Sequence, residues 1–198
     1  PRSPEQWATP ATPVDFFDLK ADVEALLAIS GAAGAFDFEP AEHPALHPGH
    51  SARLLRAGQP VGWLGRLHPQ LEAQLGLGDS PLLFEIELAA LTAGRVPAYA
   101  EVSRFPSVRR DLAVVLPQAV PVADILATAR VACAQAPVQE VLVFDVYQGA
   151  GVPAGCKSVA LGITLAATER TLTDADVDPL ITRVLHALAE AHQAHLRD

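Results

Sequence analysis

The sequence predicts an α+β protein built from two units. Stretches in which apolar and polar residues alternate are typical of strands, and stretches with apolar residues three and four positions apart are typical of helices. Residues 91–107, between two groups of such elements, follow neither period and contain Gly94, Pro97 and Pro106. We therefore expect one unit at residues 1–97 and a second at residues 98–198.

The first unit is expected to hold antiparallel strands and two helices. A helix is predicted at 16–29, with Asp15 or Asp18 at its start and with an apolar stripe formed by Phe16, Leu19, Val23, Leu26 and Leu27. The segment SARLLRAGQPVGWLGRLHP indicates two strands around a turn at 57–60, and Pro69 then opens a short helix. The segment LLFEIELAAL alternates like a strand as far as Leu88.

The second unit is predicted to have the order β-α-β-β-α-(β). Strands are expected at 109–116, in VQEVLVFDVYQG and in CKSVALGITLAAT, and helices at 121–134 and in TDADVDPLITRVLHALAEAHQAHL, where Thr173 is the cap. The segment HLRD leaves room for a short last strand. This is the ferredoxin-like arrangement, an antiparallel sheet with two helices on one face.

The stretch GAGVPAGCKS, residues 149–158, superficially looks like a phosphate-binding loop. Such a loop requires G-x-x-x-x-G-K-[ST] before a helix, but here Cys156 separates Gly155 from Lys157. The following residues alternate like a strand, so no helix start would face a phosphate. We therefore interpret the stretch as the connection of a β-hairpin.

The two faces of the predicted sheet differ in side-chain size. The face under the helices is expected to hold Leu112, Val114, Leu116, Leu142, Phe144, Val146, Val159, Leu161 and Ile163. The opposite face is expected to hold Arg109, Asp111, Ala113, Val115, Val143, Asp145, Tyr147, Ser158, Ala160, Gly162 and Thr164. Small residues, one aromatic ring and a few polar groups are what single-stranded RNA uses on an open sheet. A solvated face, or one covered by another domain, is the alternative interpretation.

Composition excludes several classes of protein. A net charge of −9, from 14 basic and 23 acidic residues, argues against binding nucleic acid by charge alone. The two cysteines form no C-x-x-C pair and are typical of a reducing cytoplasm, and no apolar run reaches the ~18 residues of a membrane span. His43, His47 and His50 could ligate zinc, but Pro44 and Pro48 disrupt the helix that would align them.

Three segments of the second half resemble a known family. FPSVRRDLAVVL, VFDVYQGAGVPAGCKSVALGITL and RTLTDADVDPLITRVLHAL resemble the C-terminal, ferredoxin-fold anticodon-binding domain of bacterial phenylalanyl-tRNA synthetase β subunits. In the first half, DFFDLKADVEALL, HPGHSARLL, VGWLGRLHP and FEIELAAL resemble the end of that subunit's class II synthetase-like domain, which is not catalytic. One departure is His50, where the family often has arginine.

The resemblance implies part of an α2β2 ligase that joins phenylalanine to its tRNA in the cytoplasm. The complete enzyme uses ATP and magnesium, and its catalytic site belongs to the α subunit, so no catalytic residue, cofactor or metal is expected in this segment. The second unit is expected to bind the anticodon region of phenylalanine tRNA. The positions that match the RNA-facing sheet are Arg109, Asp111, Asp145, Tyr147 and Ser158, with Lys157 nearby.

Two other functions fit a ferredoxin-like unit. One is an amino-acid-sensing regulatory module that binds its ligand where two copies pair. The other is a subunit-assembly domain whose open sheet packs on a partner. The chain contains no methionine, so we also expect it to be a piece of a longer protein, with exposed apolar edges and a tendency to self-associate.

Overall fold

The computed structural model describes residues 6–8, 10–94, 96, 99 and 103–197. The chain forms two compact units, residues 1–99 and 100–198. The boundary expected between residues 97 and 98 lies outside the described residues.

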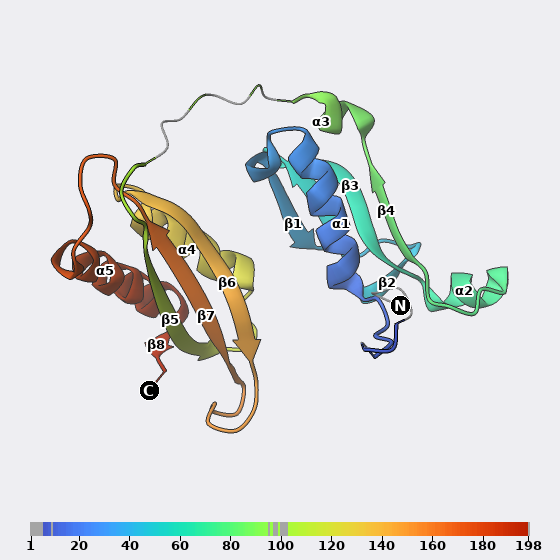
Figure 1. Ribbon diagram of the computed structural model, residues 1–198. Helices are drawn as coiled ribbons and strands as arrows, with labels where there is room; N and C mark the ends of the chain where they lie inside the picture. Colours follow the sequence, from blue (N-terminus) through green and yellow to red (C-terminus); the bar gives the residue numbers. More distant parts are fainter. Residues whose placement is uncertain (1–5, 9, 95, 97–98, 100–102, 198) are drawn as a thin grey trace. The chain divides into compact units, whose positions relative to one another are not determined.

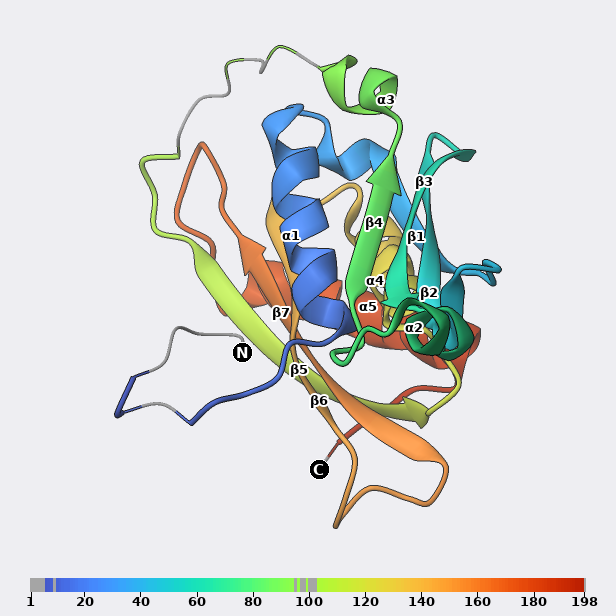
Figure 2. The same ribbon diagram turned by 90° about the vertical axis from the view of Figure 1, so that its right-hand side faces the viewer.

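Unit 1 is a four-stranded antiparallel sheet with a helix along one face (Figures 1 and 2). The strand order is β1-β2-β3-β4, with β1 at Phe36–Pro40, β2 at Leu46–Arg56, β3 at Gln59–Leu67 and β4 at Leu82–Ile86. The helix α1, Phe16–Ile29, buries Leu19, Val23 and Leu27 against the sheet. The shorter helices are η1 at Ala33–Ala35, α2 at Pro69–Leu75 and α3 at Leu88–Thr92.

Local sequence explains where the main elements of unit 1 begin. The Asp15 carboxylate accepts hydrogen bonds from the backbone N–H groups of Phe17 and Asp18, which confirms it as the cap of α1. The β2–β3 hairpin turns at Ala57 and Gly58, whose φ angles of 49° and 78° are those of a tight two-residue turn. Pro69 stands in the first turn of α2, as expected.

The strand predicted through Leu88 is shorter than its alternation indicated. β4 ends at Ile86, and Leu88–Thr92 form α3 instead. Leu and Ala favour helix, and the guanidinium of Arg56 donates to the backbone carbonyls of Ala90 and Ala93 at the end of that helix. A contact from a distant strand thus helps to decide the local structure here.

Unit 2 has the predicted ferredoxin-like topology. Its antiparallel sheet has the order β6-β7-β5-β8, with β5 at Val108–Pro117, β6 at Val138–Tyr147, β7 at Cys156–Leu165 and β8 at His195–Leu196. The helices α4, Val122–Cys133, and α5, Asp174–His192, lie on the same face of the sheet (Figure 1). Their apolar stripes form one core with β5, β6 and β7.

The predicted faces of β5 and β7 are confirmed, but the prediction for β6 is wrong in part. β6 contains two irregularities in its pairing with β7, between Val138 and Glu140 and between Val143 and Asp145. Val141 and Val143 therefore pack into the core, whereas Leu142 lies opposite Gly162 on the other face and Phe144 is 50% exposed. Each β-bulge inserts one residue and shifts the alternation.

The loop at 148–155 is a hairpin connection, as predicted. It joins β6 to β7 and extends beyond the rest of the sheet (Figure 2). Gly151 and Gly155 have φ angles of 84° and 76°, which other residues rarely adopt. Lys157 lies in β7 and not at the start of a helix, so the phosphate-loop geometry is absent from this stretch.

Among the residues that the structure describes, no helix is both long and apolar enough to cross a bilayer.

Gly62 in β3 is predicted to tolerate no side chain. A Cβ built at Gly62 would overlap the backbone carbonyl of Glu85 in the neighbouring strand β4. We expect Gly62→Ala to lower the free energy of unfolding by about 1–3 kcal/mol, measured by urea denaturation of the chain. Gly34→Ala is the matched control, because nothing lies within 4 Å of its added Cβ, and equal losses for the two variants would contradict the prediction.

The stability contributed by the N-terminal end of α5 is predicted to fall as the pH is lowered. The Asp176 carboxylate accepts hydrogen bonds from Arg170 and from both the backbone and the hydroxyl of Thr173, and these hold its pKa well below the usual range. Because the folded pKa is the lower one, this stabilisation is present above the ordinary aspartate pKa of about 4 and is lost as the pH falls through the folded value. Asp176→Asn should therefore be less stable than wild type at neutral pH, and the gap should close in acid. A gap that is constant with pH in thermal melts would refute this.

Candidate nucleic-acid interface

The sheet face opposite α4 and α5 carries most of the residues expected to bind RNA. We call it the open face and define it by the strand register. It consists of Arg109, Asp111, Ala113 and Val115 from β5, Glu140, Leu142, Asp145 and Tyr147 from β6, and Ser158, Ala160, Gly162 and Thr164 from β7. Successive strands are about 4.8 Å apart, so residues paired across them lie side by side.

The middle of the open face consists mainly of residues with small side chains. Asp145 of β6, Ala160 of β7 and Ala113 of β5 form one row across the sheet, and Gly162 belongs to the next row. Ala160 and Ala113 carry only a methyl group, whereas Gly162 lies beneath the guanidinium of Arg109. A planar ligand can therefore approach the backbone here, with the exposed carboxylate of Asp145 at its edge.

One end of the open face is built around Arg109. Its Nε donates to Oδ1 of Asp111 at 2.8 Å, and its guanidinium lies 5.2 Å from the centre of the Phe144 ring. Gly162 makes room for this arrangement, because a Cβ there would lie 2.9 Å from the Arg109 Nη2. The bulge in β6 presents Phe144 to this arginine, so the sequence prediction that placed Phe144 in the core missed the contact.

The other end of the open face is built around Tyr147. The guanidinium of Arg197, which follows β8, lies 5.1 Å from the centre of the Tyr147 ring, and its Nη1 donates to Oγ of Ser158 at 3.5 Å. The Tyr147 hydroxyl donates to the carbonyl of Ala150 in the hairpin loop at 3.3 Å. Arg197 was not among the residues predicted from the sequence to bind RNA. Because Arg197 stands two residues after His195, it would lie on the same face of a strand, but the prediction for HLRD went no further than a short strand.

Lys157 is separated from the other predicted residues. It pairs with Leu116 on the helix side of the sheet, is 7% exposed, and its Nζ donates to the carbonyl of Val120. Burial lowers the pKa of its ammonium group. The structure thus brings five of the six predicted residues to the open face, where Ser158 is buried, and places Lys157 under the helices, away from any ligand bound to that face.

Comparison with known proteins assigns the chain to a family. Residues 103–197 match the model of the ferredoxin-fold anticodon binding domain, and residues 1–88 match that of the phenylalanyl tRNA synthetase beta chain CLM domain. Together the two models match most of the chain. The chain belongs to the phenylalanine–tRNA ligase β-subunit family.

Individual relatives agree with this assignment. The phenylalanine–tRNA ligase β subunit of Methylococcus capsulatus is 48% identical over 98% of this chain and 24% of its own length. Those of Pseudomonas syringae pv. tomato and Aliivibrio fischeri are 45% and 41% identical over 99% and 100% of this chain, and over 25% of their own lengths. The chain thus spans about a quarter of the length of the curated relatives it matches.

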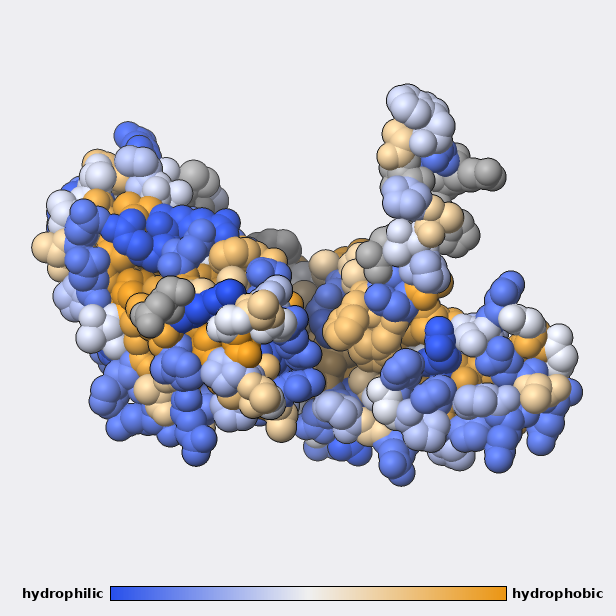
Figure 3. Space-filling model, turned by 90° about the horizontal axis from the view of Figure 1, so that it is seen from below, coloured by the Kyte–Doolittle hydropathy of each residue, from blue (hydrophilic) through white to orange (hydrophobic). Residues whose placement is uncertain are grey.

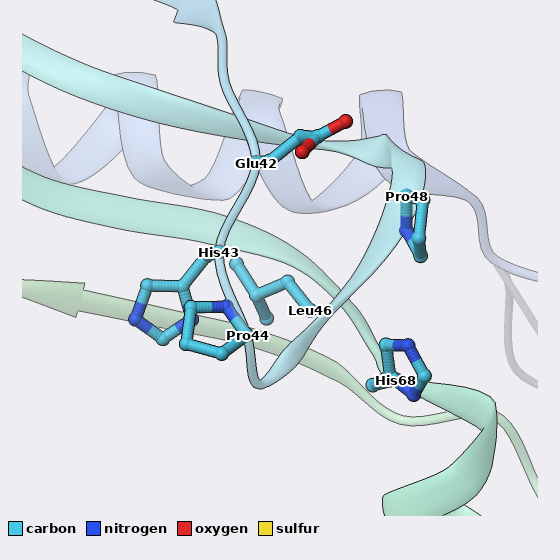
Figure 4. A pocket seen from close by; sticks show the side chains of 6 residues that line it. All are labelled: Glu42, His43, Pro44, Leu46, Pro48 and His68. Atoms are coloured by element: carbon cyan, nitrogen blue, oxygen red, sulfur yellow. The ribbon is translucent and has the colours of Figure 1, made fainter.

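Unit 1 of this family member has a pocket of about 440 Å³ beside the histidine-rich loop. Glu42, His43, Pro44, Leu46, Pro48 and His68 line it, and Figure 4 shows Glu42, His43 and His68 pointing in different directions. His43 packs against Trp63, and His47 stacks on His50 with ring centres 4.7 Å apart. Within the described residues, no group of His, Cys, Asp or Glu has an arrangement that could hold a metal ion.

The buried position of Lys157 predicts slow chemical modification. The chain has one other lysine, Lys20, whose side chain is 28% exposed, and it provides an internal control. An amine-reactive reagent should label Lys157 on the order of tenfold more slowly than Lys20, because labelling requires local opening of the fold. Mass spectrometry of the labelled peptides measures the two rates. Equal rates would show that Lys157 is accessible, and Lys157 would then again be a candidate RNA-binding residue.

Proposed function

We propose that the chain is the tRNA-binding and assembly portion of the β subunit of a phenylalanine–tRNA ligase, and that the open face holds the anticodon region of phenylalanine tRNA. The single observation that carries the proposal is the exposed Tyr147 ring beside the small side chains of Ala113 and Ala160, within the region that matches the anticodon-binding family model.

The chemistry of the open face supports binding of unpaired bases. Bases of an anticodon loop expose their flat surfaces and their hydrogen-bonding edges, and aromatic side chains bind such surfaces by stacking. Tyr147 is 37% exposed and can provide that platform. The Asp145 carboxylate is an acceptor for N–H groups on a base edge, and Arg109 offers N–H donors beyond the one it gives to Asp111.

The electrostatics of the chain make stacking more important than charge. The net charge is −9, so long-range attraction of RNA to the chain as a whole is unfavourable. Affinity must then come from the local surface, where Arg109 and Arg197 lie at the two ends of the open face. We infer that the isolated chain binds RNA weakly and that the rest of the ligase contributes further contacts.

Unit 1 is proposed to serve assembly with the ligase α subunit in an α2β2 complex. Figure 3 shows apolar surface on both units, and in unit 1 the exposed fractions are 72% for Phe17, 82% for Ile29 and 71% for Leu88. Exposed apolar surface of this kind is typical of a binding face.

Because this apolar surface is exposed, we expect the isolated chain to self-associate, and a strictly monomeric sedimentation profile at high concentration would contradict this.

The complete ligase is proposed to act in the cytoplasm and to attach phenylalanine to its tRNA with ATP and magnesium, at a catalytic site on the α subunit. The loop at 148–155 does not have the geometry of a nucleotide phosphate-binding loop. This loop leads into a strand, and the described residues contain no metal-binding group. We therefore assign no catalytic step to this chain.

Tyr147→Ala is the variant that tests the proposed interface. We expect it to weaken binding of the anticodon stem-loop of phenylalanine tRNA by about 1–3 kcal/mol, because one base loses its stacking partner. Titration of the 198-residue chain with labelled stem-loop measures the effect, and Tyr147→Phe is the matched control that keeps the ring. Equal affinities of wild type and Tyr147→Ala would remove Tyr147 from the site.

The same preparation separates the rival functions. Heat released on addition of free phenylalanine, with no response to RNA, would favour an amino-acid sensor. Protection of the open face from hydrogen exchange by the α subunit would favour a pure assembly role. Cross-linking of phenylalanine tRNA to the complete ligase, with cross-linked peptides mapped onto residues 103–197, is the test in the intact enzyme.

A further inference from the structure

Arg197 lies at the Tyr147 end of the open face and is available for a ligand. We propose that Arg197 is a phosphate-binding residue, which contacts the RNA backbone next to the nucleotide whose base stacks on Tyr147. The proposal rests on the proposed function, because it assigns a further binding residue to the same surface.

The backbone fixes the direction in which Arg197 points. β8 pairs antiparallel with β5, with Val114 opposite Leu196 and Val115 opposite His195, and the Arg197 N–H donates to the Ala113 carbonyl at 2.8 Å. Because the register continues to Ala113, the Arg197 side chain emerges on the open face. From there it reaches Ser158 on β7 and the Tyr147 ring on β6.

The charge of Arg197 is less compensated than that of three other arginines of unit 2. Arg109 is paired with Asp111, Arg110 with Asp174 and Arg170 with Asp176. For Arg197, by contrast, no ion pair with a carboxylate is found among the described residues. Its side-chain hydrogen bond is long, 3.5 Å, and goes to the neutral hydroxyl of Ser158.

A guanidinium in this setting matches a phosphate better than a base. It has five N–H donors in a planar fork that fits phosphate oxygens, and here one donor is engaged in a weak bond. The contact with the Tyr147 ring holds the fork in place beside the stacking platform. A nucleotide that stacks on Tyr147 brings its own phosphate to this end of the sheet, where Arg197 can neutralise it.

The salt dependence of RNA binding tests the proposal. A residue that neutralises one phosphate of a single strand contributes about 0.7 to the slope of log K against log salt concentration. Arg197→Gln keeps N–H donors but removes the charge, so we expect about tenfold weaker binding of the anticodon stem-loop at low salt and a slope reduced by about 0.7. Titrations of the 198-residue chain at several salt concentrations measure both quantities.

Arg197→Lys is the matched variant. It keeps the charge and loses the planar fork, so its slope should equal that of wild type even if its affinity falls. A role limited to supporting Tyr147 would lower affinity in Arg197→Gln without changing the slope, and that result would overturn the proposal. Tighter binding by Arg197→Gln would also overturn it, because Arg197 would then be covering the ring against RNA.

Failure of this proposal can be distinguished from failure of the proposed function. If wild type binds the stem-loop and Tyr147→Ala weakens it, but Arg197→Gln leaves the slope unchanged, only the assignment of Arg197 is wrong. If wild type fails to bind the stem-loop and no cross-links to phenylalanine tRNA form in the complete ligase, both are wrong. Thermal melts of the three variants show whether each remains folded.

Discussion

The pairing of β7 with strands on both sides is the constraint on which the second unit depends. β7 pairs with β5 over its whole length and with β6 on its other edge, and its side chains alternate between two environments. Val159, Leu161 and Ile163 are fully buried under the helices, while Ala160 and Gly162 lie on the side of the open face. A substitution that shifts the register of this strand would therefore damage the core and the candidate RNA surface together.

The charges of this acidic chain leave the open face as its candidate surface for RNA. Arg109, Arg110 and Arg170 are each paired with an aspartate, which limits the attraction of any polyanion to the molecule as a whole. What remains is a flat region with an aromatic ring at each end, each in contact with a guanidinium. Such a surface favours a ligand that offers planar groups and spaced negative charges over one that offers charge alone.

Much of this fold could be predicted from sequence because its signals are local. The caps at Asp15 and Thr173, the turn at Ala57 and Gly58, and the alternation of β5 and β7 each lie within a few residues of the structure they specify. What could not be predicted depends on distant partners. Nothing within β6 marks its bulges, and α3 is held by Arg56 from another strand.

The residues of the candidate site also fall into those that local alternation predicted and those that depend on distant contacts. Five residues followed from simple alternation along three strands, and alternation also placed Lys157 on the opposite side from Ser158, a signal that the sequence prediction passed over. Arg197 could be placed only once the pairing of the final strand and the reach of its side chain were known.

The bulge at Phe144 affects how the sequences of relatives should be aligned with this one. Because Val143 pairs with Leu161 and Asp145 with Ala160, a homologue that lacks this one residue would keep Asp145 and Tyr147 in place, so a single gap there is compatible with an unchanged open face.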